Sequence, residues 1–294
     1  MFDIPVKKVE IFEVGPRDGL QNEKEFIPTE KKLELIRLLR DAGCARIELT
    51  SFVHPKWVPQ MADALEIIDH VDLSDGAEYN ALIPNMKGFL RALETPLTQV
   101  VTIMSASESH NTKNLNMSVA ESLEQMREIN RIAREHNVKV RSYIGTAYGC
   151  PMEGNVPFEK VKDIALALEE AGSYEISLGD TTGMASPDQS FDIAYDLLKH
   201  LKHARLAVHF HQARGIEFAN ILASLQAGIT IFDSAAGGLG GCPYAPGATG
   251  NIATETLVEM FDSMGIDTGI DREKIRKAAF YATSLSAYHR GTCS

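Results

Sequence analysis

The sequence contains no apolar run that approaches the roughly 20 residues a membrane-spanning helix needs. The first residues, Met1 to Pro5, pass almost at once into a predicted strand and lack the pattern of a signal or transit peptide. We therefore expect a cytoplasmic protein that has no membrane partner.

Cysteine is scarce: the four residues Cys44, Cys150, Cys242 and Cys293 are scattered, and no two of them form a C-x-x-C pair. This spacing argues against a disulfide framework and against a structural zinc site. Positive charge is also in short supply, since the formal net charge is -11. A strongly acidic chain is a poor partner for nucleic acid, although a locally positive site would still accept an anionic substrate.

Short runs rich in β-branched residues recur along the chain and alternate with helical patterns. The predicted strands are Lys8–Val14, Arg46–Thr50, Glu78–Leu82, Gln99–Met104, Lys139–Ile144, Tyr174–Leu178, Leu206–Phe210 and Ile229–Asp233. Apolar residues at three- and four-residue spacing predict helices over Glu30–Arg40, Val119–His136, Phe158–Glu170 and Ile216–Ala227.

Residues typical of helix ends flank these segments. Thr29 and Ser118 stand at predicted N-caps, and the Ala-Gly pairs at 42–43 and 171–172 stand at predicted C-caps. Repeated strand–helix units favour a closed (β/α)8 TIM barrel. The alternative, an open doubly wound sheet, usually carries G-x-G-x-x-G after its first strand, and this sequence lacks it there. We predict one domain over 1–294, with about 271–294 as a helical appendage.

Chemically reactive residues follow the predicted strands, where the active sites of such barrels lie. Arg17 and Asp18 follow the first strand, and Glu48 lies in the second. Ser177 and Asp180 flank the end of the sixth strand. His209 and His211 close the seventh strand, and Cys242 follows the eighth within a glycine-dense loop, Gly237–Asn251. Such a loop allows a backbone to approach a ligand closely.

The His209-x-His211 spacing offers two imidazoles on one face of a strand. With a carboxylate oxygen from Asp18 and an amide oxygen from Asn251, the set suits Mg²⁺ or Mn²⁺ better than a structural zinc. Paired hydrogen-bonding histidines and a turn-forming Asp18 are the alternative interpretation. Arg17 would clamp an anion or stabilise a negative oxygen, or pair with Glu48 or Asp180. Cys242 would be a proton donor or nucleophile, or a small packing residue.

These residues lie in motifs that resemble the 3-hydroxy-3-methylglutaryl-CoA lyase family of metal-dependent TIM-barrel lyases and condensing enzymes. The resemblance covers nearly the whole chain. Its motifs are Glu13–Glu23, Thr50–Val53 with Pro55–Met61, Ile176–Thr181, and the glycine loop through Asn251.

The resemblance implies metal ligation by Asp18, His209, His211 and Asn251, polarisation of the substrate by Arg17, and proton transfer by Cys242. It implies further site roles for Glu48, Ser177, Asp180 and Gly241, with His209 or Asp18 as a base. The implied reaction is retro-Claisen cleavage of an acyl-CoA to acetoacetate and acetyl-CoA with Mg²⁺ or Mn²⁺, a step of leucine catabolism, in a homodimer or a larger homo-oligomer.

Some positions depart from the family pattern. His211 is followed by Gln212 and Ala213 where the family carries Asp-Thr, so metal binding would be looser if that Asp orients an imidazole. His54 replaces a small Ser, and Thr146 replaces a Cys of some relatives.

Other functions fit parts of the pattern. A citramalyl-CoA-like or branched 3-hydroxyacyl-CoA would be an alternative substrate. Claisen condensation, metal-dependent hydrolysis and a degenerate barrel that acts as a binding module are the other classes.

Overall fold

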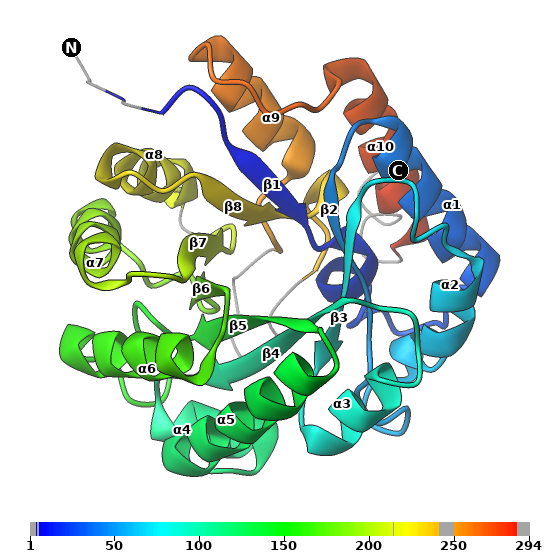
Figure 1. The fold of residues 1–294 in the computed structure, drawn as a ribbon. Coiled ribbons are helices and arrows are strands. Elements are labelled where there is room, and N and C mark those ends of the chain that lie inside the picture. Colours follow the sequence, from blue (N-terminus) through cyan, green and yellow to red (C-terminus); the bar gives the residue numbers. More distant parts are fainter. Residues whose placement is uncertain (1–3, 5, 214, 241–249, 287–294) are drawn as a thin grey trace.

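The protein is described from a computed structural model, which covers residues 4, 6–213, 215–240 and 250–286. Eight parallel strands pair in chain order, and β8 pairs with β1, so the sheet closes into a barrel (Figure 1). The strands are β1 Glu10–Glu13, β2 Arg46–Ser51, β3 Glu78–Ile83, β4 Gln99–Ser105, β5 Lys139–Gly145, β6 Glu175–Asp180, β7 Arg205–Phe210 and β8 Ile231–Ser234. The TIM-barrel prediction is confirmed, and closure excludes the open sheet.

Helices surround the barrel, and the bounds of α1, α5, α6 and α8 lie close to those expected from the periodicity. They are α1 Thr29–Asp41, α2 Ala64–His70, α3 Met86–Ala92, α4 Glu108–Leu115, α5 Val119–Glu135, α6 Phe158–Ala171, α7 Pro187–His200, α8 Glu217–Ala227, α9 Thr254–Ser263 and α10 Arg272–Leu285. Short helical turns lie at η1 Gly15–Gly19, η2 Pro59–Met61 and η3 Ala236–Gly238. Within the described residues, no helix has both the length and the apolar character needed to cross a membrane.

Three of the four predicted caps are correct. Ser118 forms a capping box with Glu121 at the start of α5, and Gly172 ends α6 in the left-handed conformation, at φ 113°. Gly43 follows the end of α1 with φ 99°. The prediction for Thr29 is wrong: Pro28 is the N-cap of α1, and the Thr29 hydroxyl instead donates to Asp63 Oδ2 at 3.1 Å.

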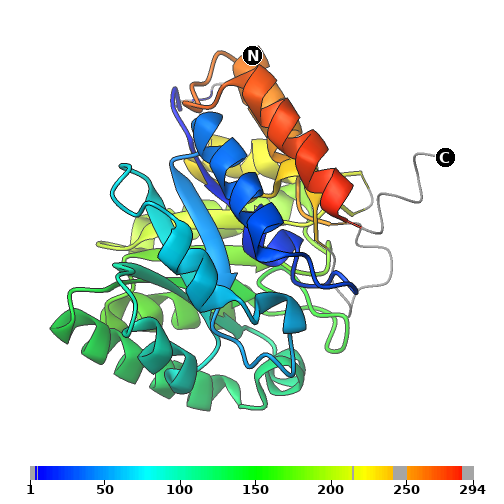
Figure 2. The same cartoon turned by 90° about the vertical axis from the view of Figure 1, so that its right-hand side faces the viewer.

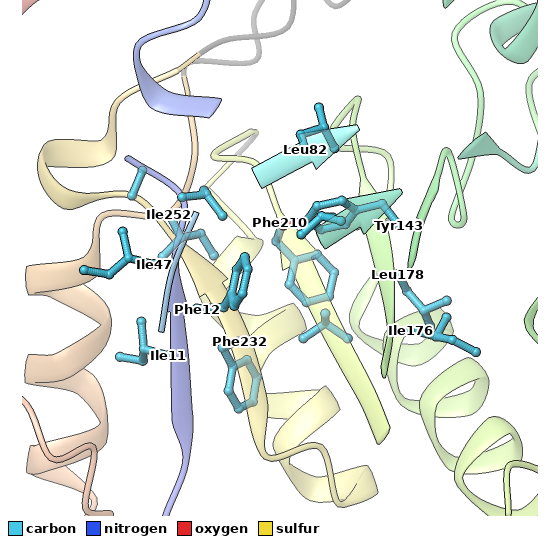
Figure 3. Packing of buried hydrophobic residues seen from close by; sticks show 14 of the residues in the cluster. Ile11, Phe12, Ile47, Leu82, Tyr143, Ile176, Leu178, Phe210, Phe232 and Ile252 are labelled. Carbon is cyan, nitrogen blue, oxygen red and sulfur yellow. The ribbon is translucent and has the colours of Figure 1, made fainter. Parts of the chain in front are cut away.

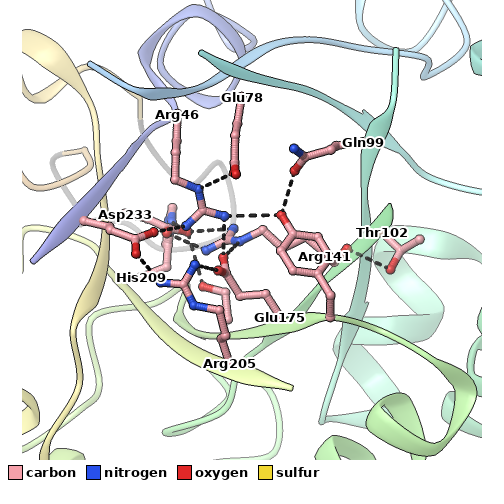
Figure 4. A network of polar contacts seen from close by, with 12 residues as sticks. Arg46, Glu78, Gln99, Thr102, Arg141, Glu175, Arg205, His209 and Asp233 are labelled. Atoms are coloured by element: carbon pink, nitrogen blue, oxygen red, sulfur yellow. Dashed lines mark hydrogen bonds and ion pairs between the residues drawn. The ribbon is translucent and has the colours of Figure 1, made fainter. Parts of the chain in front are cut away.

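The apolar core lies between the sheet and the helices, because alternate strand residues face opposite sides. Ile11, Ile47, Ile176 and Phe232 belong to this core (Figure 3), and the Phe232 ring lies 5.1 Å from that of Phe261 on α9. The inside of the barrel is polar by contrast. Buried arginines and carboxylates meet there (Figure 4), where branched apolar residues dominate in many TIM barrels.

Helix α10 packs against α1 and η3, and Figure 2 shows it alongside α1. It begins at Arg272, close to the start of the appendage predicted for 271–294. The division into one domain with an appendage stays a prediction.

Candidate metal and substrate site

Two of the predicted site residues lie on η1, the helical turn that directly follows β1. Pro16 stands in its first turn, Arg17 is buried and Asp18 is half-buried. A Cβ on Gly19 would lie 2.8 Å from the Cβ of Leu239, so a side chain there would collide with the chain that follows η3. Glycine at this position lets the segment after β1 pack directly against the segment after β8.

The Arg17 guanidinium is fixed between two carboxylates. Its Nε lies 2.5 Å from Glu48 Oε2, and its Nη1 lies 2.6 Å from Asp18 Oδ1. Burial alone would lower the pKa of Arg17, but Glu48 and Asp18 raise it above its ordinary value. Arg17 is therefore a permanent, oriented cation at the C-terminal end of the barrel, and the predicted pairing with Glu48 is present.

His209 and His211 face each other at the end of β7, with their Nε2 atoms 3.1 Å apart. One ligand atom from each of Asp18, His209 and His211 lies within 4.8 Å of the others. The backbone of Asn251 pairs with that of His211 in an isolated antiparallel β-bridge. The side-chain Nδ2 of Asn251 donates to Asp18 Oδ2 at 2.7 Å. The ligand atoms of three residues that the sequence suggested therefore converge, and the fourth, Asn251, lies beside them.

The protonation states of this cluster suit a cation. Burial first, and then the neighbouring His209, lower the pKa of His211 to about 4, so its imidazole is neutral at pH 7. Burial would raise the pKa of Asp18, but Arg17 and the two histidines lower it to about 2. The buried Asn251 Oδ1 and His211 Nδ1 have no hydrogen-bond partner among the described residues. Neutral imidazole, carboxylate and free amide oxygen form the donor set that Mg²⁺ or Mn²⁺ would accept.

Asp233, on β8, is a site residue that the sequence reasoning missed. Its Oδ2 lies 3.3 Å from His209 Nδ1 and accepts from the Ser177 hydroxyl at 3.2 Å. Its Oδ1 lies 2.6 Å from Arg141 Nη2, and this cation together with His209 keeps the pKa of the carboxyl far below its ordinary value despite burial. A carboxylate that holds the second nitrogen of a ligand histidine fixes the tautomer and the orientation of the ring. In the sequence, the one signal that could have identified Asp233 was its position as a carboxylate at the end of an apolar strand.

Asp180 and Ser177 lie at different depths at the end of β6. The Asp180 carboxylate accepts from the backbone amides of Met184, at 2.8 Å, and Ala185, at 3.1 Å, so it holds the loop that follows the strand. Ser177 is fully buried and contacts Asp233 inside the barrel. A catalytic role for Asp180 and a substrate-binding role for Ser177 stay predictions. Gly241 and Cys242 lie outside the described residues, and their predicted roles also remain predictions.

The residues that depart from the family pattern lie around the rim of the barrel. The backbone N–H of Gln212 donates to the Gly250 carbonyl at 2.8 Å, next to the proposed ligand Asn251. Thr146 follows β5 and is buried with φ 54°, a left-handed conformation rare for a β-branched residue. His54 is exposed on the loop after β2.

Comparisons with known proteins identify relatives over nearly the whole barrel. The family model described as HMGL-like matches residues 8–281. Hydroxymethylglutaryl-CoA lyase YngG of Bacillus subtilis is 48% identical over 273 residues, which are 93% of this chain and 91% of that protein. The crystal structure of the Bacillus subtilis HMG-CoA lyase superposes with a TM-score of 0.91 at 45% identity, covering 98% of this chain and 99% of that one. A structure of an Acinetobacter baumannii HMG-CoA lyase in complex with coenzyme A and 3-methylmalate has a TM-score of 0.90 at 39% identity, covering 95% and 91% of the chains.

Proposed function

The chain belongs to the HMGL-like family, and from this premise we propose that it is a carbon–carbon lyase that cleaves 3-hydroxy-3-methylglutaryl-CoA to acetoacetate and acetyl-CoA. The observation that carries the proposal is the convergence of Asp18, His209 and His211, beside the amide oxygen of Asn251, which has no hydrogen-bond partner in the part of the chain that the structure describes. These residues would hold Mg²⁺ or Mn²⁺. When bound, the cation would act as a Lewis acid toward the oxygens of the substrate.

The residues of the chain supply the remaining chemistry. Arg17, fixed by Glu48 and Asp18, would donate from its remaining nitrogen, Nη2, to a substrate oxygen and oppose negative charge there. The proton of the C3 hydroxyl would pass to His209 or Asp18.

As the C2–C3 bond breaks, the hydroxyl carbon becomes the ketone of acetoacetate, and the electron pair of the bond passes to the thioester enolate. A proton then completes the methyl group of acetyl-CoA, and the Cys242 thiol is the proposed donor. Glu48 orients Arg17. Ser177, Gly241 and Asp180 complete the proposed substrate site.

The proposal extends to the substrate class, the cellular compartment, the oligomeric state and the domain organisation of the enzyme. The Acinetobacter complex with coenzyme A supports an acyl-CoA as the small-molecule substrate. We also propose that the enzyme works in the cytoplasm and as a homo-oligomer of at least two chains. Residues 1–294 would act as one barrel domain, with 271–294 as its appendage.

The decisive experiment measures release of acetyl-CoA from 3-hydroxy-3-methylglutaryl-CoA, with Mg²⁺ or Mn²⁺ and again with a chelator. We expect release that the chelator abolishes and that either cation restores. A folded, metal-loaded protein that releases nothing would contradict the substrate assignment. The same assay with citramalyl-CoA and with branched 3-hydroxyacyl-CoA esters would then identify the acyl group.

A further inference from the structure

Glu13 is a fully buried carboxylate that faces away from the reaction site. It follows Phe12 on β1, and the Phe12 ring lies inside the barrel, 4.1 Å from the Arg141 guanidinium carbon. Neighbouring strand residues face opposite sides, so Glu13 points into the layer between the sheet and the helices. A group in that position cannot touch the substrate, and any influence on the chemistry must pass through its neighbours.

The carboxylate of Glu13 accepts hydrogen bonds from three separate parts of the chain. Its Oε1 accepts from the backbone amide of Gly15 at 2.8 Å and from that of Ala236 at 3.0 Å. Its Oε2 accepts from the hydroxyl of Thr254 at 2.6 Å. Ser234 Oγ lies 2.8 Å from the same hydroxyl, which ties the end of β8 to the group.

Each of these parts leads directly to a residue of the proposed site. Gly15 begins η1, which carries Arg17 and Asp18. Ala236 begins η3, and the glycine loop starts at the next residue. Thr254 is the first residue of α9 and lies just after the Asn251 ligand. The contacts are tight, since a Cβ on Gly15 would lie 2.6 Å from Glu13 Oε1.

We propose that Glu13 is a positioning residue that holds η1, the start of the glycine loop and the Asn251 segment in one arrangement, so that Asp18 and Asn251 meet the histidines. This inference rests on the proposed function, because it concerns the same metal site. Without the carboxylate, two buried amides and a buried hydroxyl lose their acceptor, and such groups are costly to leave unpaired. The three segments would then shift to find other partners, and the ligand atoms would separate.

The role does not depend on the charge of Glu13. Burial, and to a smaller extent the neighbouring Glu255, raise its pKa to about 7 against the lowering effect of its three hydrogen bonds. In the neutral acid, Oε1 still accepts from both amides, while Oε2 donates its proton to the Thr254 hydroxyl. A glutamine presents the same pattern, since its Oε1 accepts from the amides and its Nε2 donates to Thr254.

The test compares Glu13→Ala with Glu13→Gln, using Ile11→Ala as the matched control. Ile11 is buried on the same face of β1, two residues earlier, and belongs to the apolar core. Titration calorimetry with Mn²⁺ gives the affinity of each folded variant, and thermal unfolding gives its stability. We expect Glu13→Ala to weaken Mn²⁺ binding by about 10–100-fold, the range typical for partners of metal ligands. Glu13→Gln should stay close to the wild type, and Ile11→Ala should lose stability while keeping its affinity.

Wild-type Mn²⁺ affinity and turnover in folded Glu13→Ala would overturn the proposal. An equal loss of affinity in Ile11→Ala would overturn it too, because the effect would then follow stability alone. If Glu13→Ala does not fold, Thr254→Val removes one of the three donors. It should weaken Mn²⁺ binding by several-fold, and an unchanged affinity would count against the proposal. Failure of the wild-type protein itself to bind Mn²⁺ would instead contradict the proposed function.

Discussion

Two clusters of buried charge lie inside the same barrel, and they differ in what their polar atoms face. In the lower cluster, at the N-terminal ends of the strands, guanidinium groups meet carboxylates: Arg46 Nη2 and Arg141 Nε lie 3.0 Å and 2.5 Å from Glu175 Oε1, and Arg46 Nε lies 3.0 Å from Glu78 Oε2 (Figure 4). At the mouth, two histidine nitrogens instead face each other at 3.1 Å beside Asp18.

Both clusters are buried, so burial does not distinguish a structural cluster from a functional one. The kind of contact that their polar atoms make does. Buried ion pairs are stable only when each charge has a partner, and the lower cluster meets that condition within the chain. At the mouth, imidazole nitrogens, a carboxylate oxygen and an amide oxygen lie together instead, and this is the donor set that a cation from outside the chain would accept. Asp233 belongs to both clusters, since it contacts Arg141 below and His209 above.

The largest effect should come from removing a ligand at the mouth. His209→Ala deletes one of the two facing imidazoles, so we expect metal-dependent turnover to fall to background, well beyond the roughly 10–100-fold cost of losing a partner of a ligand. Acetyl-CoA release and Mn²⁺ titration would measure it, with the exposed His203→Ala as control. Wild-type turnover in folded His209→Ala would remove this histidine from the site.

A change in the lower cluster should affect stability alone. Arg46→Met removes a cation from Glu175 and Glu78 while keeping an unbranched side chain that fills part of the same space. Breaking a buried pair in this way costs about 3–5 kcal/mol in the free energy of unfolding. Urea unfolding would measure the loss, and Mn²⁺ affinity at a temperature where the variant is folded should stay unchanged. A large loss of affinity would show that the two clusters do not act separately.

The raised pKa of the buried Glu13 predicts that the free energy of unfolding depends on pH. Its pKa rises from 4.5 to about 7 on folding, so between these values the folded chain holds a proton that the unfolded chain releases. The contribution of this group is therefore complete below pH 4.5 and is lost as the pH rises through 7, by at most about 3 kcal/mol. Urea unfolding across this window should show a smaller downward slope in Glu13→Gln than in the wild type. Identical slopes would contradict the raised pKa.

Asp233 tests the link between the clusters. Asp233→Asn keeps the shape of the side chain but removes the charge that faces His209 and Arg141. We expect Mn²⁺ affinity to fall about 10–100-fold, because the ring of His209 loses the partner that orients it. Calorimetry would measure this fall, with the exposed Asp188→Asn as control. Unchanged affinity would make Asp233 a member of the lower cluster only.

The smallest effect is expected at the rim. Gln212 follows the His211 ligand, and its backbone amide bonds to Gly250. Gln212→Asp places a carboxylate beside the imidazoles, so we expect tighter Mn²⁺ binding or higher turnover of 3-hydroxy-3-methylglutaryl-CoA, by up to about tenfold. Steady-state kinetics and Mn²⁺ titration together would measure it. No change in either quantity would mean that the position tolerates both side chains.

The sequence alone determined the order of the eight strands and the approximate limits of α1, α5, α6 and α8, because local periodicity and helix-capping residues set them. It also placed the reactive residues at strand ends, and in a parallel barrel all strand ends of one kind share a rim. The predicted pair Arg17–Glu48 and the four predicted ligands are close together for this reason. The N-cap at Thr29 was wrong because a tertiary contact with Asp63 claimed its hydroxyl.

Only the tertiary structure decided the partners of the buried charges. Asp233 pairs with Arg141 at a separation of 92 residues, and Glu13 with Thr254 at 241. No local pattern marks such pairs, because they follow from the closure of the barrel and from the register of its strands. The sequence therefore determined which residues stand at the rim, and the fold decided which of their polar atoms are satisfied by the chain and which remain for a ligand.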